Sequence, residues 1–138
     1  MYSDLFSTTF LEITYRPDLG LLMGRWRCSV TEADLQAGYE ALHRAALHHG
    51  CGQWLIDSRR RVCRSLRSAE WVTTHYLPQV QQALGRPLRV GVLVLPDYLA
   101  SLPQAYSNCP PAGPVQFARF VDEGAANAWL EAGPSERE

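Results

Sequence analysis

The sequence contains no lysine, and all 13 of its basic residues are arginine. This absence excludes the phosphate-binding lysine of P-loop proteins, a Schiff-base lysine and the lysine that phosphoacceptor receiver domains use. It also means that arginines come together more readily by composition alone. An arginine cluster in this chain is therefore weaker evidence for a ligand site than it would be in a chain with both basic residues.

Strong net charge and long hydrophobic runs are absent as well. The formal net charge is −1, so there is no global positive field to drive nonspecific nucleic-acid binding, and we expect no nucleic-acid partner. The longest apolar runs fall well short of a bilayer span, and the N-terminal residues lack the pattern of a secretory signal. We therefore expect a cytoplasmic protein without a membrane partner.

Paired cysteine motifs are also missing. The four cysteines, Cys28, Cys51, Cys63 and Cys109, are widely spaced and form no Cys-x-x-Cys pair. In a chain expected in the cytoplasm, this spacing indicates reduced thiols.

What the sequence does contain suits one globular domain. With 138 residues and 46% apolar content, the chain can bury a substantial core. We expect a single α/β domain over residues 1–132, followed by a frayed polar tail over residues 133–138.

Hydrophobic periodicity predicts the order β-β-α-β-α-β-α-β-α. Period-2 alternation and short apolar runs indicate strands, and recurrence every three to four residues indicates helices. The first two strands form an antiparallel hairpin, and each later βα step implies a right-handed crossover to a parallel neighbour, giving a mixed, mostly parallel sheet. The predicted strands are 9–15, 21–28, 53–57, 89–95 and 115–120, and the predicted helices are 31–50, 68–84, 96–106 and 122–132.

Individual residues mark several of these boundaries. Thr31 and Asp34 resemble a capping pair at the start of the first helix, and Gly50 ends that helix. Pro78 lies inside the predicted second helix, where it should kink or divide the segment.

The stretch 53–68 is the most informative part of the chain. A short apolar strand ends at Asp57, and five arginines follow before the next helix: Arg59, Arg60, Arg61, Arg64 and Arg67. In α/β folds, ligands bind beyond the carboxyl ends of the strands. These arginines could clamp a phosphate or nucleotide together with the free N–H groups of the helix that begins near Ser68. The alternative is a solvated loop whose arginines pair with surface acids.

Asp57 itself has two interpretations. It could be a buried carboxylate that tunes a ligand, or it could bond loop amides or an arginine, as acids at strand ends commonly do. Asp97 and Asp122 also follow strands, so the three acids could hold a magnesium ion at one edge of the sheet. Helix capping explains Asp97 and Asp122 more simply, and we expect no metal and no cofactor.

Two further groups invite comparison with catalytic or metal sites. Cys63 is followed by Arg64 and Arg67, which resembles rhodaneses, whose active-site cysteine opens a loop of amides and arginines. Nearby arginines would lower the pKa of a thiol. The cysteine-to-arginine spacing of tyrosine phosphatases is not met, because residue 69 is alanine. His48, His49 and Cys51 could supply metal ligands, but histidines are also favoured at a helix C-terminus by the helix dipole.

The order of elements and the Trp-Leu-Ile-Asp strand (54–57) that leads to a serine-containing helix start resemble the SpoIIAA-like, or STAS/SEC14-type, bacterial domains. The resemblance covers nearly the whole chain. It implies a regulatory or ligand-binding module, and in the anti-sigma-factor antagonists of this family a serine in this region is phosphorylated. Ser65 and Ser68 occupy the corresponding positions here.

The sequence thus favours a nonenzymatic regulatory or binding module. Its ligand is expected to be a protein partner or a phosphate-bearing small molecule, and the first hairpin could present an edge strand for a homodimer. The predicted ligand-binding residues are Asp57, Arg59, Arg60, Arg61, Arg64, Arg67 and Ser68. The alternative is a rhodanese-like or phosphatase-like enzyme that uses Cys63.

Overall fold

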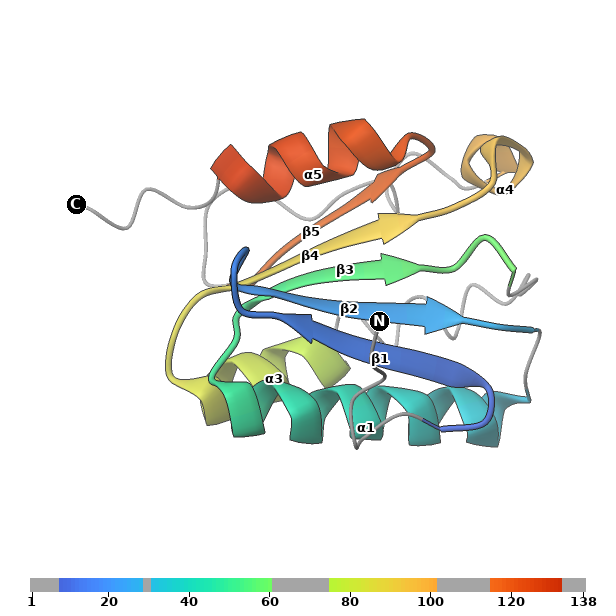
Figure 1. Cartoon of the computed structure of the whole chain (residues 1–138). Helices are drawn as coiled ribbons and strands as arrows, with labels where there is room; N and C mark the ends of the chain where they lie inside the picture. Colours follow the sequence, from blue (N-terminus) through green and yellow to red (C-terminus); the bar gives the residue numbers. More distant parts are fainter. Residues whose placement is uncertain (1–7, 29–30, 61–74, 102–114, 133–138) are drawn as a thin grey trace.

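The computed structural model describes residues 8–28, 31–60, 75–101 and 115–132. Within these ranges the elements follow the order that the sequence predicts (Figure 1). They are β1 (Leu11–Arg16), β2 (Leu21–Trp26), α1 (Glu32–His49), β3 (Gln53–Asp57), α3 (Leu77–Leu84), β4 (Leu88–Leu93), α4 (Pro96–Ser101), β5 (Val115–Phe120) and α5 (Glu123–Ala132). The chain is therefore an α/β protein.

The described strands form one mixed five-stranded sheet in the order β1-β2-β3-β4-β5. β1 pairs with β2 in antiparallel fashion, which confirms the predicted hairpin, and the three later pairs are parallel. Because each parallel strand lies beside the previous one along the chain, the carboxyl ends of β2, β3, β4 and β5 meet at the same edge of the sheet.

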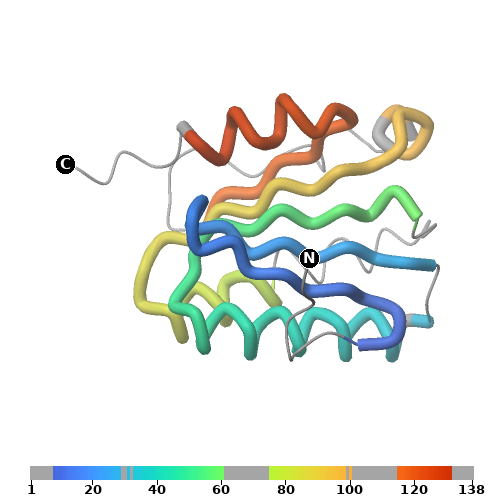
Figure 2. The backbone as a smooth tube through the Cα atoms, in the orientation of Figure 1, coloured from blue at the N-terminus to red at the C-terminus, as the bar shows by residue number. Residues whose placement is uncertain are grey.

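Helices cover both faces of this sheet (Figures 1 and 2). α1 and α3 lie on one face, and α5 lies on the other. The first face holds the larger core, in which Trp26 and Trp54 are fully buried. The second face holds a smaller apolar cluster between α5 and the sheet, made of Leu21, Leu55, Leu93, Ala126 and Leu130.

The predicted helix boundaries are confirmed at three caps. The Thr31 hydroxyl accepts a hydrogen bond from the Asp34 amide (3.1 Å), and Gly50 ends α1 in a left-handed conformation with φ of 63°. At α5, a carboxylate oxygen of Asp122 accepts a hydrogen bond from the Ala125 amide (2.9 Å). Asp122 therefore acts as the predicted helix cap.

Asp97 differs from its predicted position, whereas the kink predicted at Pro78 stays a prediction. Pro78 is the second residue of α3, and residues 75–76 directly before α3 form a π-helical turn. Prolines and π-helical turns are both common where helices bend. Asp97 lies inside the first turn of α4 and not at its cap, where a carboxylate still interacts favourably with the helix dipole. The rest of the predicted helix 68–84, the end of the predicted helix 96–106 and the tail 133–138 lie outside the described residues.

No helix within the described ranges is long and apolar enough to cross a membrane.

A buried arginine attaches α5 to the sheet. Arg89 of β4 is only 6% exposed, and its guanidinium donates to the carbonyl oxygen of Trp129 (2.6 Å) and to the side chain of Gln116. It also lies 3.9 Å from the ring centroid of Trp129, a cation–π arrangement. Nearby, the Gln53 amide donates to the carbonyl of Leu130 (3.1 Å). The sheet thus supplies partners for carbonyl groups in the last turns of α5.

The packing of α1 on β2 requires a glycine. A Cβ added at Gly38 of α1 would overlap the ring of Trp26. Alanine normally stabilises a helix by about 1 kcal/mol relative to glycine, but here we expect Gly38→Ala to lower the free energy of unfolding by about 1–3 kcal/mol through overpacking. Urea denaturation would measure the loss. Gln36→Ala, at an exposed position of the same helix, should cause no loss, and a Gly38→Ala variant as stable as the wild type would contradict the close contact.

Candidate functional site

The candidate site lies at the carboxyl end of β3. Alternation along this strand directs Trp54 and Ile56 into the larger core and places Leu55 and Asp57 on the face that α5 partly covers. The register places Asp57 opposite Arg25 of β2 and Leu93 of β4. Asp57 is thus the acid in the middle of a row of side chains that crosses the sheet.

Asp57 holds the first arginine of the loop. One carboxylate oxygen accepts from the backbone amide (3.1 Å) and the Nε atom (3.0 Å) of Arg59, and the other accepts from its Nη2 atom (2.8 Å). This forked pairing fixes both the backbone and the side chain of Arg59. The predicted pairing of a strand-end acid with a loop amide and an arginine is therefore present here.

Arg59 also controls the charge of this carboxylate. Burial is the largest single influence and would raise the pKa of Asp57, since its side chain is only 14% exposed. The hydrogen bonds and positive charge of Arg59, with a smaller contribution from Arg25, outweigh burial, so the pKa of Asp57 lies below its ordinary value. Asp57 is therefore ionised at neutral pH.

Two residues complete the charged edge. The Nε atom of Arg25 lies 3.5 Å from a carboxylate oxygen of Asp57, and a carboxylate oxygen of Glu123, the first residue of α5, lies 4.0 Å from the Nη2 atom of Arg59. Both contacts are ion pairs longer than an ordinary hydrogen bond. Asp57 and Arg59 thus form the tight pair, and Arg25 and Glu123 lie beside it.

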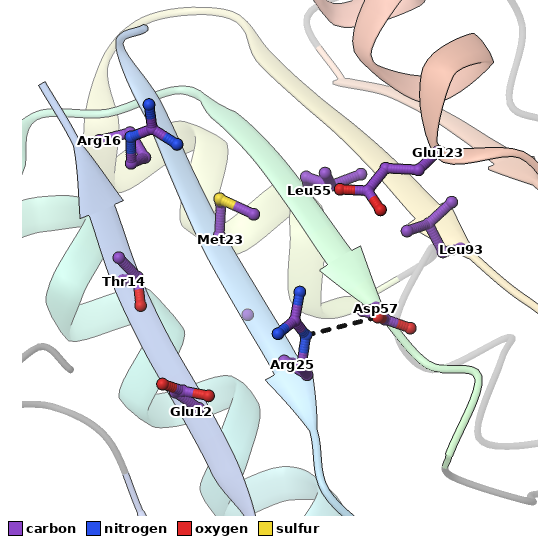
Figure 3. Close-up of a pocket in the computed structure, with 10 residues that line it drawn as sticks. Glu12, Thr14, Arg16, Met23, Arg25, Leu55, Asp57, Leu93 and Glu123 are labelled. Carbon is purple, nitrogen blue, oxygen red and sulfur yellow. Dashed lines mark ion pairs between the residues drawn. The ribbon is translucent and has the colours of Figure 1, made fainter. Parts of the chain in front are cut away.

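A shallow pocket of about 110 Å³ opens next to this charged group, on the half of the sheet face beside α5 (Figure 3). Its lining combines apolar side chains with charges of both signs. The lining residues are Glu12, Thr14, Arg16, Met23, Gly24, Arg25, Leu55, Asp57, Leu93 and Glu123.

The structure describes only part of the predicted site. Asp57 and Arg59 are joined as described above, and Arg60 is exposed. The other predicted ligand-binding residues, Arg61, Arg64, Arg67 and Ser68, lie outside the described residues. The same holds for Ser65 and for Cys63, the residue on which the enzymatic alternative depends.

The magnesium hypothesis for Asp57, Asp97 and Asp122 finds no support in the described part of the chain. Both oxygens of Asp57 are engaged by Arg59, and Asp122 caps α5. No group of three or more histidine, cysteine or acidic side chains in these ranges could hold a metal ion.

The residues at the end of α1 are engaged in packing. The Cys51 thiol is buried and donates to the carbonyls of Gln53 (3.2 Å) and Gly20 (3.4 Å), and burial raises the pKa of this thiol. The ring of His49 stacks on Tyr15 at a centroid distance of 4.0 Å. Cys51 is therefore a core residue rather than a reactive thiol.

Sequence reasoning missed Arg25 and Glu123. Alternation in β2 gives the face on which Arg25 lies, but only the β2–β3 register shows that it is opposite Asp57. Glu123 follows the cap of α5 and reaches the site because α5 folds back over the sheet. In the sequence, Glu123 is marked only by its place directly after Asp122, the predicted helix cap. This signal does not show which other residues lie near Glu123 in the fold.

Ser58 was also missed. Its hydroxyl is buried directly after Asp57, with no hydrogen-bond partner among the described residues.

No family model matches the chain, and comparison with curated proteins and with solved structures found no match. The assignment of function therefore depends on the chemistry of the site.

Replacing Asp57 tests the central pair. We expect Asp57→Asn to lower the free energy of unfolding at pH 7 by about 1–3 kcal/mol, because Arg59 loses a charged acceptor. Since the pKa of Asp57 is lowered in the folded state, its contribution is present above the ordinary aspartate pKa and is lost as the pH falls through the folded-state value. Urea denaturation at pH 7 and at about pH 3 should show the two proteins converging in acid.

Asp18→Asn is the control for this experiment, because Asp18 pairs with Arg16 in an exposed turn. Its substitution should cost much less. An Asp57→Asn variant that is as stable as Asp18→Asn at pH 7 would contradict the structural importance of the Asp57–Arg59 pair.

Proposed function

We propose that the chain is a nonenzymatic binding module of the STAS-like, SpoIIAA-like type that takes a phosphate-bearing ligand at the carboxyl edge of its parallel strands. The binding residues would be Arg59 and Arg60 together with Arg61, Arg64, Arg67 and Ser68, with Asp57 as the residue that holds the start of the loop in place.

The observation that carries this proposal is the forked bond between Asp57 and Arg59. It attaches the first arginine of the loop to the end of β3, at the edge of the sheet where α/β proteins bind ligands. Because Arg59 already pairs with the Asp57 carboxylate, the arginines that follow in the sequence do not have to neutralise this acid. Residues 58–69 contain five arginines and no acid, so this segment carries a large excess of positive charge.

The state of Asp57 favours binding over acid–base catalysis. A general acid or base works best with a pKa near the working pH and with a proton-accepting atom free to reach the substrate. The pKa of Asp57 is shifted downward, and both of its oxygens accept hydrogen bonds from Arg59. Its chemistry is therefore that of a positioning residue.

Anion binding can be tested by thermal shift and isothermal titration calorimetry with inorganic phosphate, nucleotides and sugar phosphates. We expect at least one of them to raise the melting temperature in a saturable manner. The double variant Arg60→Ala/Arg61→Ala should bind about tenfold more weakly or worse, because each lost charge-assisted hydrogen bond costs more than a kcal/mol. The difference in affinity between the wild type and the double variant should become smaller at high salt.

Arg44→Ala provides the matched control. Arg44 is an exposed arginine on α1, which lies on the face of the sheet away from α5. This variant should bind phosphate compounds like the wild type. The proposal is wrong if none of these compounds stabilises the protein, or if the double variant and the control respond equally.

The family resemblance makes a separate prediction about phosphorylation. If the module is switched as anti-sigma-factor antagonists are, a fraction of the protein isolated from its native cell should carry phosphate on Ser65 or Ser68. Mass spectrometry of the intact protein and of its peptides would detect a mass increase at these residues. Protein that carries no phosphate under any growth condition would count against a switch of this kind.

A further inference from the structure

We propose that the pocket beside α5 is a second binding site, separate from the arginine loop, and that it takes a small zwitterion with an aliphatic side chain, namely an apolar α-amino acid. The carboxylate of this ligand would bind Arg25, its ammonium group would bind Glu123, and its side chain would lie against Met23, which packs on the cluster of Leu55 and Leu93. The site does not depend on phosphate binding by the loop.

The charged side chains of the lining differ in how fully they are already bonded. Arg16 holds Asp18 through two hydrogen bonds of 3.2 and 2.9 Å. Asp57 uses both oxygens on Arg59. Glu12 forms an ion pair with Arg27 at 3.9 Å and takes part in further contacts. These groups therefore shape the walls but have little capacity left for a ligand.

Arg25 and Glu123 have such capacity. Within the described residues, the Arg25 guanidinium makes only the 3.5 Å ion pair with Asp57 and is half exposed. The Glu123 carboxylate makes only the 4.0 Å ion pair with Arg59 and is 45% exposed. The two groups carry opposite charges and line one pocket. A ligand that satisfies both must itself carry one positive and one negative group.

The floor of the pocket lies between these charges and is apolar. In Figure 3, Arg25 reaches from β2 toward Asp57, and Glu123 reaches from the start of α5 toward Leu55, with Leu93 beside it. Leu55 and Leu93 belong to the apolar cluster under α5, and Met23 packs against that cluster. Leu55 and Leu93 are already buried, so the half-buried Met23 supplies the apolar surface that an aliphatic group placed here would remove from water.

The size of the pocket limits the ligand. A volume of about 110 Å³ corresponds to roughly four water molecules, which suits a compound of few heavy atoms. It is well below the roughly 300–1,000 Å³ of pockets that enclose nucleotides and drug-sized molecules. A guanidinium also recognises a carboxylate with matched geometry, through two parallel hydrogen bonds. Small size, an apolar body and two opposite charges together describe an aliphatic amino acid.

The test uses the full chain and three amino acids, L-alanine, L-valine and L-leucine, in thermal-shift and isothermal titration measurements. We expect saturable stabilisation by at least one of them. Two analogues of valine separate the charges: valinamide lacks the carboxylate, and 3-methylbutanoate lacks the ammonium group. Each should bind about tenfold more weakly than the amino acid or worse, since each leaves one charged side chain unpaired.

Variants then assign the contacts. Arg25→Gln and Glu123→Gln should each reduce the affinity for the amino acid about tenfold or more, while Arg44→Gln on the opposite face should leave it unchanged. The melting temperatures of the unliganded variants would show whether each protein remains folded. The Arg60→Ala/Arg61→Ala variant should retain the amino-acid response, so amino-acid binding can be distinguished from phosphate binding by the loop.

Three results would overturn the proposal: no stabilisation by any of the three amino acids, equal stabilisation by valine and by its analogues, or undiminished amino-acid binding in a folded Arg25→Gln variant. The second result would indicate an apolar contact without charge recognition, and the third would place the ligand elsewhere on the protein.

Discussion

The parallel register between β2 and β3 is the constraint on which the candidate site depends. This register pairs Arg25 with Asp57, and the other three strand pairings extend the row across the sheet to Glu12, Leu93 and Phe120. A slip of one residue would turn Asp57 toward the larger core and would bring Ile56 to the charged edge. Such a slip would bury an unpaired carboxylate and expose an aliphatic side chain, so the hydrophobic core that fixes the register also fixes the chemistry of the edge.

The two faces of the sheet explain why this chemistry appears on one side only. The face under α1 and α3 carries large apolar side chains from all five strands, such as Ile13, Trp26, Trp54, Val90 and Phe117. On the other face, α5 lies over the apolar cluster formed by Leu21, Leu55 and Leu93. β1 carries polar and charged side chains on this face instead, namely Glu12, Thr14 and Arg16, and β2 adds Arg25 near its end. The pocket lies at the boundary, where apolar and charged surfaces meet.

Much of the fold could be predicted because its signals are local. Alternation gave both strands of the first hairpin, Thr31 and Gly50 marked the ends of α1, and Asp122 marked the start of α5. The candidate site could be predicted only in part. Asp57 and Arg59 are two residues apart in sequence, so their pairing is a local event. Arg25 and Glu123 come from segments that lie beside Asp57 only after the sheet has formed and α5 has packed on it, and no local pattern contains that information.

The bonding of Arg89 has a consequence for how the protein unfolds. Its guanidinium is buried at the start of β4, the strand between β3 and β5, and its partners include the carbonyl and ring of Trp129 in α5. If α5 detached alone, this guanidinium would exchange those partners for water and would lose its contact with the Trp129 ring, in addition to the exposure of the apolar cluster. α5 and the inner strand β4 are thereby joined into one cooperative unit, so the amide hydrogens of α5 should exchange at the rate of the core and not at that of a fraying end.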